Sequence, residues 1–186
     1  MAALAVTACG DGAPAFHATD ISGTTEWGRD FALPDAKGQV RTLAEFRGKA
    51  VVLFFGYTQC PDVCPTTLAA MAAVMKQLDS DAARLQVVFV TLDPERDTPP
   101  LIAEYMPRFH PGFLGLRGDK AATEAAAKEF KVFYTKQAAG AGGGYTLDHT
   151  AGSYVFDPQG RLRLYVRHGA PAADIAADLK LLLEGQ

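Results

Sequence analysis

Two cysteines, Cys60 and Cys64, are the residues of this chain best suited to chemistry, because they stand only four positions apart. A pair of thiols at this spacing can exchange disulfides, hold a soft metal ion, or lock a loop as a structural bridge. Three residues separate them rather than the two of a typical redox motif, which widens the bite between the sulfurs and favours metal. Thiolates select copper(I), zinc or iron–sulfur clusters. Two sulfurs alone leave a coordination sphere incomplete, so a further ligand is expected.

A strand and a helix flank the two thiols. Residues 51–55 read VVLFF, and an unbroken apolar run of this kind predicts a strand buried on both faces of a sheet. Pro65 stands where a helix would begin, because the N–H that proline lacks has no intrahelical partner there. Both thiols are therefore expected at the C-terminal edge of a sheet and at a helix N-terminus, where a thiolate is stabilised. Apolar residues then recur three or four apart, which predicts a buried helix face: Leu68, Met71, Ala72, Met75 and Leu78.

Length and composition predict a single folded α/β domain. The chain has 186 residues, of which 48% are hydrophobic and 21% charged, as in an ordinary globular protein. Its net charge of -3 argues against a nucleic-acid partner, which would require clustered Lys and Arg. No stretch approaches the roughly 18 consecutive apolar residues of a membrane span.

The order of the remaining elements predicts a thioredoxin-like, three-layer α/β domain with a central mixed sheet, an N-terminal hairpin extension and an inserted helix. Charged residues at 93–97 follow the second buried strand, and parallel strands would bring them to the same edge as the cysteines. Two stretches, 110–119 and the glycine-rich 138–144, are interpreted as loops. The expected elements are a hairpin at 31–43, strands at 86–92 and 132–135, helices at 99–109, 120–131 and 174–184, and a hairpin that joins 154–157 to 161–167.

Four histidines could supply the missing ligand. His17, His110 and His168 are interpreted as solvated side chains in a tether, a surface loop and at the end of an exposed strand. His149 stands just before the strand expected to pair with the central one, on a loop that faces the cysteines. Beside two thiols at the same edge, it becomes the natural third donor.

Three motifs together resemble the Sco/SenC family of copper chaperones, which have a thioredoxin fold and serve the assembly of cytochrome c oxidase. They are GYTQCPDVCP at 56–65, DPERD at 93–97 and DHT at 148–150, within a similarity that covers residues 31–183. The resemblance implies that Cys60, Cys64 and His149 bind copper. It also implies delivery of copper(I) or copper(II) to the binuclear CuA site in the copper-bearing oxidase subunit, on the outer face of an energy-transducing membrane, with another copper chaperone as a further partner.

The sequence pattern near the N-terminus predicts how such a domain would be attached to the membrane. Residues 2–9 read AALAVTAC and are similar to the end of a bacterial lipoprotein signal, although a basic region and a longer apolar region are missing. Residues 1–24 are therefore interpreted as a signal remnant and flexible tether, with Cys9 as the lipidated anchor. Residues 25–186 are expected to form a monomeric copper-binding domain in the bacterial periplasm.

The same dithiol leaves alternative functions open. Cys60 and Cys64 could instead be the redox pair of a periplasmic thiol–disulfide oxidoreductase. A carrier without turnover is favoured over this enzyme because residues 146–153 contain His149 but lack the proline that faces the dithiol in thioredoxin-fold reductases. A peroxidase is favoured less, since an activating Thr and Arg pair is not evident. The glycine-rich stretch before His149 also suggests the hypothesis that this ligand swings away to release metal.

Overall fold

The centre of the fold is strand β4 (Ala50–Gly56), in which all seven residues are buried. We describe a computed structural model that places residues 15–138 and 144–186. Alternate residues of β4 enter two different cores: Val52 and Phe54 pack on one face of the sheet, whereas Leu53 and Phe55 pack on the other. The prediction of a central strand buried on both faces is confirmed.

Six strands form the main sheet in the order β1-β10-β9-β4-β5-β6. The strands β4, β5 and β6 are parallel, while β9 and β10 run antiparallel and form a hairpin, so the expected mixed sheet is confirmed. Because β4 and β5 are parallel, their C-terminal ends share one edge, as expected for residues 93–97. The other strands are β1 (Thr19–Asp20), β5 (Leu85–Thr91), β6 (Leu114–Leu116), β9 (Ser153–Phe156) and β10 (Leu162–Val166).

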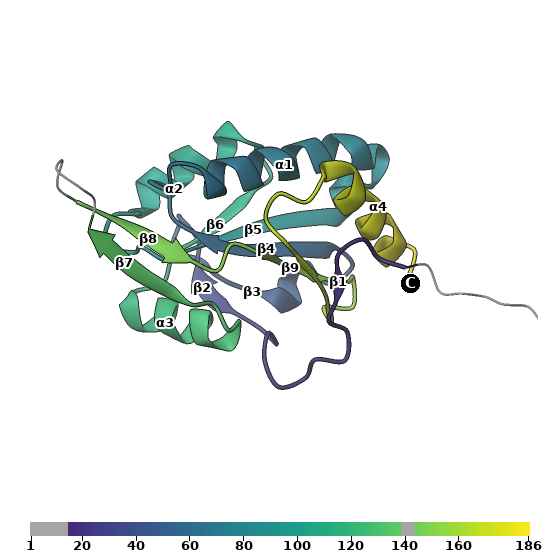
Figure 1. Ribbon diagram of the computed structural model, residues 1–186, viewed down its shortest axis with the longest axis horizontal. Helices are drawn as coiled ribbons and strands as arrows, with labels where there is room; N and C mark the ends of the chain where they lie inside the picture. Colours follow the sequence, from purple (N-terminus) through teal and green to yellow (C-terminus); the bar gives the residue numbers. More distant parts are fainter. Residues whose placement is uncertain (1–14, 139–143) are drawn as a thin grey trace, which may run out of the picture.

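Helices cover both faces of this sheet, which gives the three layers of a thioredoxin-like domain (Figure 1). On one face lie α1 (Val63–Leu78), α2 (Pro99–Tyr105) and α4 (Ala172–Leu183). The opposite face carries α3 (Lys120–Glu129) and the expected N-terminal hairpin of β2 (Ala32–Pro34) and β3 (Val40–Thr42). Short 3-10 turns connect these elements at Leu43–Phe46, Asp79–Arg84 and Met106–Arg108.

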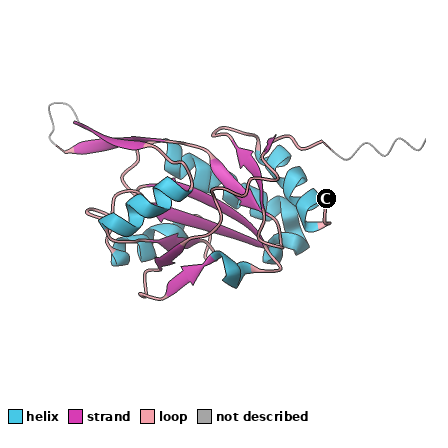
Figure 2. Ribbon diagram, turned by 90° about the horizontal axis from the view of Figure 1, so that it is seen from below, coloured by secondary structure: helices cyan, strands magenta, loops and turns pink. Residues whose placement is uncertain are grey.

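A second hairpin differs most from the sequence-based expectation. Strand β7 (Tyr134–Ala138) pairs with β8 (Tyr145–His149) in a sheet of its own, which projects from one end of the molecule (Figure 2). His149 is therefore the last residue of a strand and does not lie in a loop. The expected strand at 132–135 begins and ends later, and the loop predicted at 110–119 contains β6. Of the loop expected at 138–144, residues 139–143 lie outside the described part of the chain.

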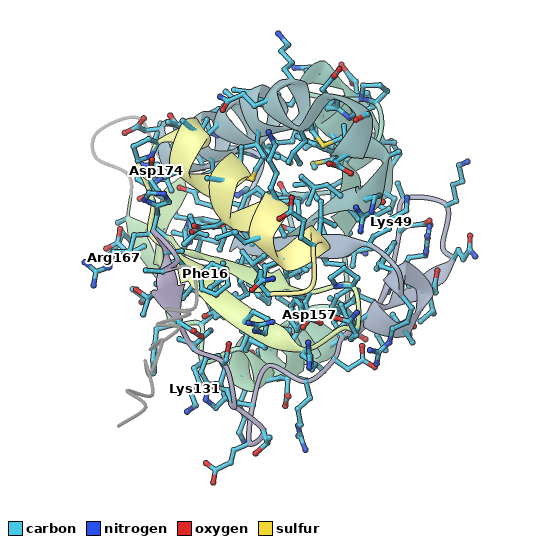
Figure 3. The ribbon with its side chains drawn as sticks, turned by 90° about the vertical axis from the view of Figure 1, so that its right-hand side faces the viewer. Phe16, Lys49, Lys131, Asp157, Arg167 and Asp174 are labelled. Atoms are coloured by element: carbon cyan, nitrogen blue, oxygen red, sulfur yellow. The ribbon has the colours of Figure 1, made fainter. Side chains whose placement is uncertain are left out.

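Part of the predicted N-terminal tether belongs to the folded domain. The backbone N–H groups of His17 and Ala18 donate to the buried carboxylate of Asp178 at 2.9 and 2.8 Å, and β1 adds to the edge of β10. Phe16 packs against the core beneath α4 (Figure 3). Residues 16–20 of the tether predicted at 1–24 therefore pack against or pair with the folded domain. Cys9 lies outside the described residues, and within those residues no helix is long and apolar enough to cross a membrane.

Candidate metal centre

The two thiols lie where β4 ends and α1 begins. Cys60 is half-buried in the connecting loop, and Cys64 is fully buried in the first turn of the helix. Gly56, the last residue of β4, permits this arrangement because a Cβ atom at that position would lie only 2.4 Å from the Cys64 Sγ. The backbone N–H of Cys64 points to the Cys60 Sγ at 3.5 Å. A helix N-terminus therefore faces the outer sulfur, as the sequence predicts.

The two sulfurs have opposite proton affinities. A hydrogen bond from the Cys64 thiol lowers the pKa of Cys60 to about 4, assisted by the backbone N–H groups of Asp62 and Cys64. The same interaction, together with burial, raises the pKa of Cys64. The pair therefore holds one proton at neutral pH, with a thiolate at the more exposed sulfur. Such a thiolate is both a nucleophile and a metal ligand.

His149 turns one ring nitrogen toward the thiols. Its Nδ1 lies 2.9 Å from the carbonyl oxygen of Thr150 and must donate to it, because a carbonyl can only accept. In the neutral imidazole the other nitrogen, Nε2, carries the lone pair, and it lies 3.9 Å from the Cys64 Sγ. The edge of the Tyr57 ring packs against the imidazole, with 6.1 Å between ring centroids. Fixing one nitrogen by a hydrogen bond so that the other can bind metal is the usual arrangement of histidine ligands.

The structure brings together the three residues that the sequence singles out. One sulfur from Cys60, one from Cys64 and one nitrogen from His149 lie within 4.8 Å of one another, and within the described residues no other group of three His, Cys, Asp or Glu side chains comes this close. An open cavity of about 430 Å³ between the cysteine loop and β8 is lined by Cys60 and His149, whereas Cys64 is fully buried. Two thiolates and an imidazole provide a soft, three-coordinate site that suits copper(I), and an added oxygen donor would suit copper(II).

The remaining histidines stand apart from this group. His17 lies in the N-terminal segment beside Asp178, and His110 accepts from the N–H of Gly112 in its own turn. His168 is exposed and lies 3.3 Å from the hydroxyl of Thr67 on α1.

Residues after β5 hold the cysteine loop. This agrees with the prediction that residues 93–97 and the cysteines lie at the same edge of the sheet. Asp97 is fully buried and accepts from the N–H of Thr58 at 3.0 Å and from the hydroxyls of Thr58 and Thr91. Burial raises the pKa of Asp97 despite these hydrogen bonds. The sequence alone predicts no role for Asp97 or for its neighbour Arg96. Two signals marked these residues in the sequence: the charged cluster at 93–97 follows a strand next to the cysteine strand, and it matches the DPERD motif of the family resemblance.

Comparisons with known proteins place this geometry in context. The family model described as SCO1/SenC matches residues 19–184. A relative from Mus musculus, "Protein SCO2 homolog, mitochondrial", is 36% identical over 153 residues, which are 81% of this chain and 60% of the relative. The chain thus spans less than two thirds of that protein.

Two solved structures are similar over nearly their whole length. The copper-bound structure of ScoI from Bradyrhizobium japonicum has 37% identity and a TM-score of 0.74, and the match covers 84% of this chain and 98% of that one. The solution structure of apo Sco1 from Thermus thermophilus has 40% identity and a TM-score of 0.77, with 91% and 97% covered.

Proposed function

Because the chain belongs to the SCO1/SenC family, we propose that it is a copper metallochaperone that binds copper through Cys60, Cys64 and His149. It delivers the metal to, or prepares the cysteines of, the binuclear CuA site of cytochrome c oxidase. Copper is its cargo, so the protein needs no turnover of its own. The observation that carries this proposal is the meeting of two sulfurs and one nitrogen within 4.8 Å at an open edge of the fold.

The chemistry of the donor set supports a soft metal ion such as copper. The site combines soft sulfur donors with a borderline nitrogen donor and offers no carboxylate among its three ligands, which disfavours hard cations such as magnesium and calcium. The similar ScoI structure from Bradyrhizobium japonicum is described with copper bound. A carrier must also release its metal, and a half-exposed Cys60 gives a partner's thiolate direct access to the bound ion.

The proposed partners follow from the family resemblance. They are the copper-bearing subunit of cytochrome c oxidase and a further copper chaperone that loads the site. The domain is proposed to work in the bacterial periplasm, attached to the membrane through Cys9, a residue outside the described part of the chain.

A second function, reduction of disulfides in the oxidase subunit or in another chaperone, is favoured by one observation. The low pKa of Cys60 makes it an attacking thiolate at neutral pH, and the buried Cys64 would then resolve the mixed disulfide. Both functions use the same sulfurs, whereas only copper binding requires the imidazole.

The variant His149→Ala therefore separates the two functions, with His168→Ala as a matched control that removes an imidazole elsewhere. Copper(I) affinity is measured by competition with a chelator, and disulfide reduction is measured on an oxidised peptide with a Cys pair. A carrier loses copper affinity and oxidase assembly at limiting copper in His149→Ala alone, and it keeps its thiol reactivity. Wild-type copper affinity together with normal assembly in His149→Ala would refute the proposed ligand set.

A further inference from the structure

The position of His149 relative to the thiols is not set by the main sheet. The cysteines follow β4 in the six-stranded sheet, whereas His149 ends a separate two-stranded sheet, in which it pairs with Tyr134. The hairpin has five residue pairs, from Tyr134 with His149 to Ala138 with Tyr145, so His149 lies at the opposite end of the hairpin from Ala138 and Tyr145. The contacts that dock the whole hairpin on the core therefore decide where the imidazole lies.

Arg96 makes both a hydrogen bond and a cation–π contact between that hairpin and the core. Its Nη1 donates to the carbonyl oxygen of Tyr145 at 2.8 Å, and its guanidinium carbon lies 3.6 Å from the centroid of the Tyr145 ring. The Tyr145 hydroxyl in turn donates to Asp93 at 2.7 Å, and Asp93 pairs with Arg96. Asp93 is almost completely buried. Arg96, Tyr145 and Asp93 thus form a closed triangle, in which each side chain contacts the other two.

The same arginine also reaches the cysteine loop. Its Nη1 lies 3.2 Å from the side-chain oxygen of Gln59, the residue before Cys60, and its guanidinium lies over the ring of Tyr57 at 5.7 Å. The Tyr57 hydroxyl accepts from the N–H of Leu147 on β8 at 3.2 Å. One side chain therefore touches the segment that carries the thiols and the segment that carries the imidazole.

We propose that Arg96 is a positioning residue for the metal centre, which holds the β7–β8 hairpin so that His149 Nε2 meets the two sulfurs. This inference rests on the proposed function, because it needs His149 to be a ligand. Planarity is essential to the role, since one flat guanidinium stacks on Tyr145 while its edge donates to three oxygen acceptors. A lysine keeps the charge but lacks this fork and this flat face.

The test compares Arg96→Met and Arg96→Lys with Arg161→Met. Arg161 also pairs with a fully buried aspartate, Asp157, but in the turn between β9 and β10, on the side of the molecule that faces the viewer in Figure 3. Copper(I) affinity should fall about 10- to 100-fold in both Arg96 variants, the range typical of residues that orient metal ligands. The copper(II)–thiolate absorption should shift in them, and Arg161→Met should change neither measurement.

A double variant distinguishes positioning from general loosening. If Arg96 acts through His149, then Arg96→Met combined with His149→Ala should bind copper as weakly as His149→Ala alone and no more weakly. Additive losses would overturn the proposal. If Arg96→Met fails to fold, Tyr145→Phe, which loses only the hydroxyl bond to Asp93, tests the same triangle with a smaller expected loss.

The failure of this proposal can be told apart from failure of the proposed function. Wild-type copper affinity in Arg96→Met, with a large loss in His149→Ala, would overturn the positioning role and leave the ligand set intact. Wild-type affinity in His149→Ala would overturn the ligand set itself.

Discussion

Replacing Gly56 by alanine should displace one of the proposed metal ligands, Cys64, without removing it. Gly56 ends β4 directly beneath α1, and a Cβ there would lie 2.4 Å from the Cys64 Sγ and 3.1 Å from a ring carbon of Phe89. Ordinary contact begins at 3.4 Å, so the sulfur must move by at least about 1 Å. Cys64 and Phe89 are both fully buried, and neither can give way into solvent.

The expected cost follows from overpacking. Inserting a methyl group into a filled core destabilises a protein by about 1–3 kcal/mol, and for a domain of this size about 1 kcal/mol lowers the melting temperature by about 2–4 °C. Ligand atoms in metal sites lie within about 0.2 Å of their usual distances, so a shift of the sulfur should also weaken copper binding, by about 10- to 100-fold as in other sites whose ligands lose their orientation. The assays are thermal or urea unfolding of the reduced apo protein and copper(I) competition with a chelator.

Two further variants make the result specific. Gly115→Ala is the matched control, because a Cβ at that buried glycine of β6 meets Ile102 at 2.3 Å, so it should lose similar stability while copper affinity stays unchanged. In a Cys64→Ala background the clash at Gly56 is largely removed, and Gly56→Ala should then cost much less than in the wild-type protein. Equal costs in the two backgrounds, or wild-type copper affinity in Gly56→Ala, would refute the packing argument.

Three other predictions concern protons. Because the pKa of Cys60 is lowered to about 4, its alkylation by iodoacetamide should proceed at a nearly constant rate from pH 6 to 8. The buried Cys64 should stay unmodified. An alkylation rate that rises tenfold per pH unit would contradict the lowered pKa of Cys60. Copper(I) binding at pH 7 should release close to one proton, from Cys64, because Cys60 is already a thiolate. Calorimetry in buffers of different ionisation enthalpy measures the number of protons released. A release of two protons would mean that both thiols start protonated. Arg29 lowers the pKa of Glu129 in the folded state below its ordinary value of 4.5, so this pair contributes stability that is present above that value and is lost as pH falls through the lowered pKa. Glu129→Gln should therefore lower the urea midpoint more at pH 7 than at pH 3, and an equal difference at the two pH values would refute the ion-pair explanation.

The sequence predicts the elements whose burial leaves a strong pattern. Strands β4 and β5 are continuous apolar runs because both of their faces are covered, and α1 shows its three- and four-residue spacing because only one face is covered. The cysteines lie in and just after the loop between β4 and α1, so predicting this strand and this helix also predicts where the cysteines lie. Because β4 and β5 are parallel, the residues after β5, including Asp97, lie beside the cysteine loop after β4. The position of the charged cluster at 93–97 could therefore be predicted from the sequence.

The elements that the sequence does not predict are short or exposed. Strand β7 is exposed at four of its five positions, so it has no apolar alternation, and the glycines that follow it resemble a plain loop. Strand β6 has only three residues, with a glycine in the middle, and β1 has two. Their pairing comes from backbone hydrogen bonds to neighbours already in place, a tertiary effect that local propensity does not record. The sequence likewise does not predict that Arg96 docks the hairpin, because this contact also depends on the tertiary structure.

The three proposed ligands come from two different sheets, and this separation has a chemical consequence. The two sulfurs share one rigid turn between β4 and α1, so a dithiol, a disulfide or a two-sulfur copper site can form there without the hairpin. The imidazole arrives from a different sheet, which is held by a hydrogen-bonded triangle of three side chains and by the burial of Leu147. Three-coordinate copper is therefore stabilised only while the hairpin is docked. A partner that competes for Arg96 or Tyr145 would weaken the nitrogen ligand first and leave copper on two sulfurs, from which transfer to incoming thiolates is easier.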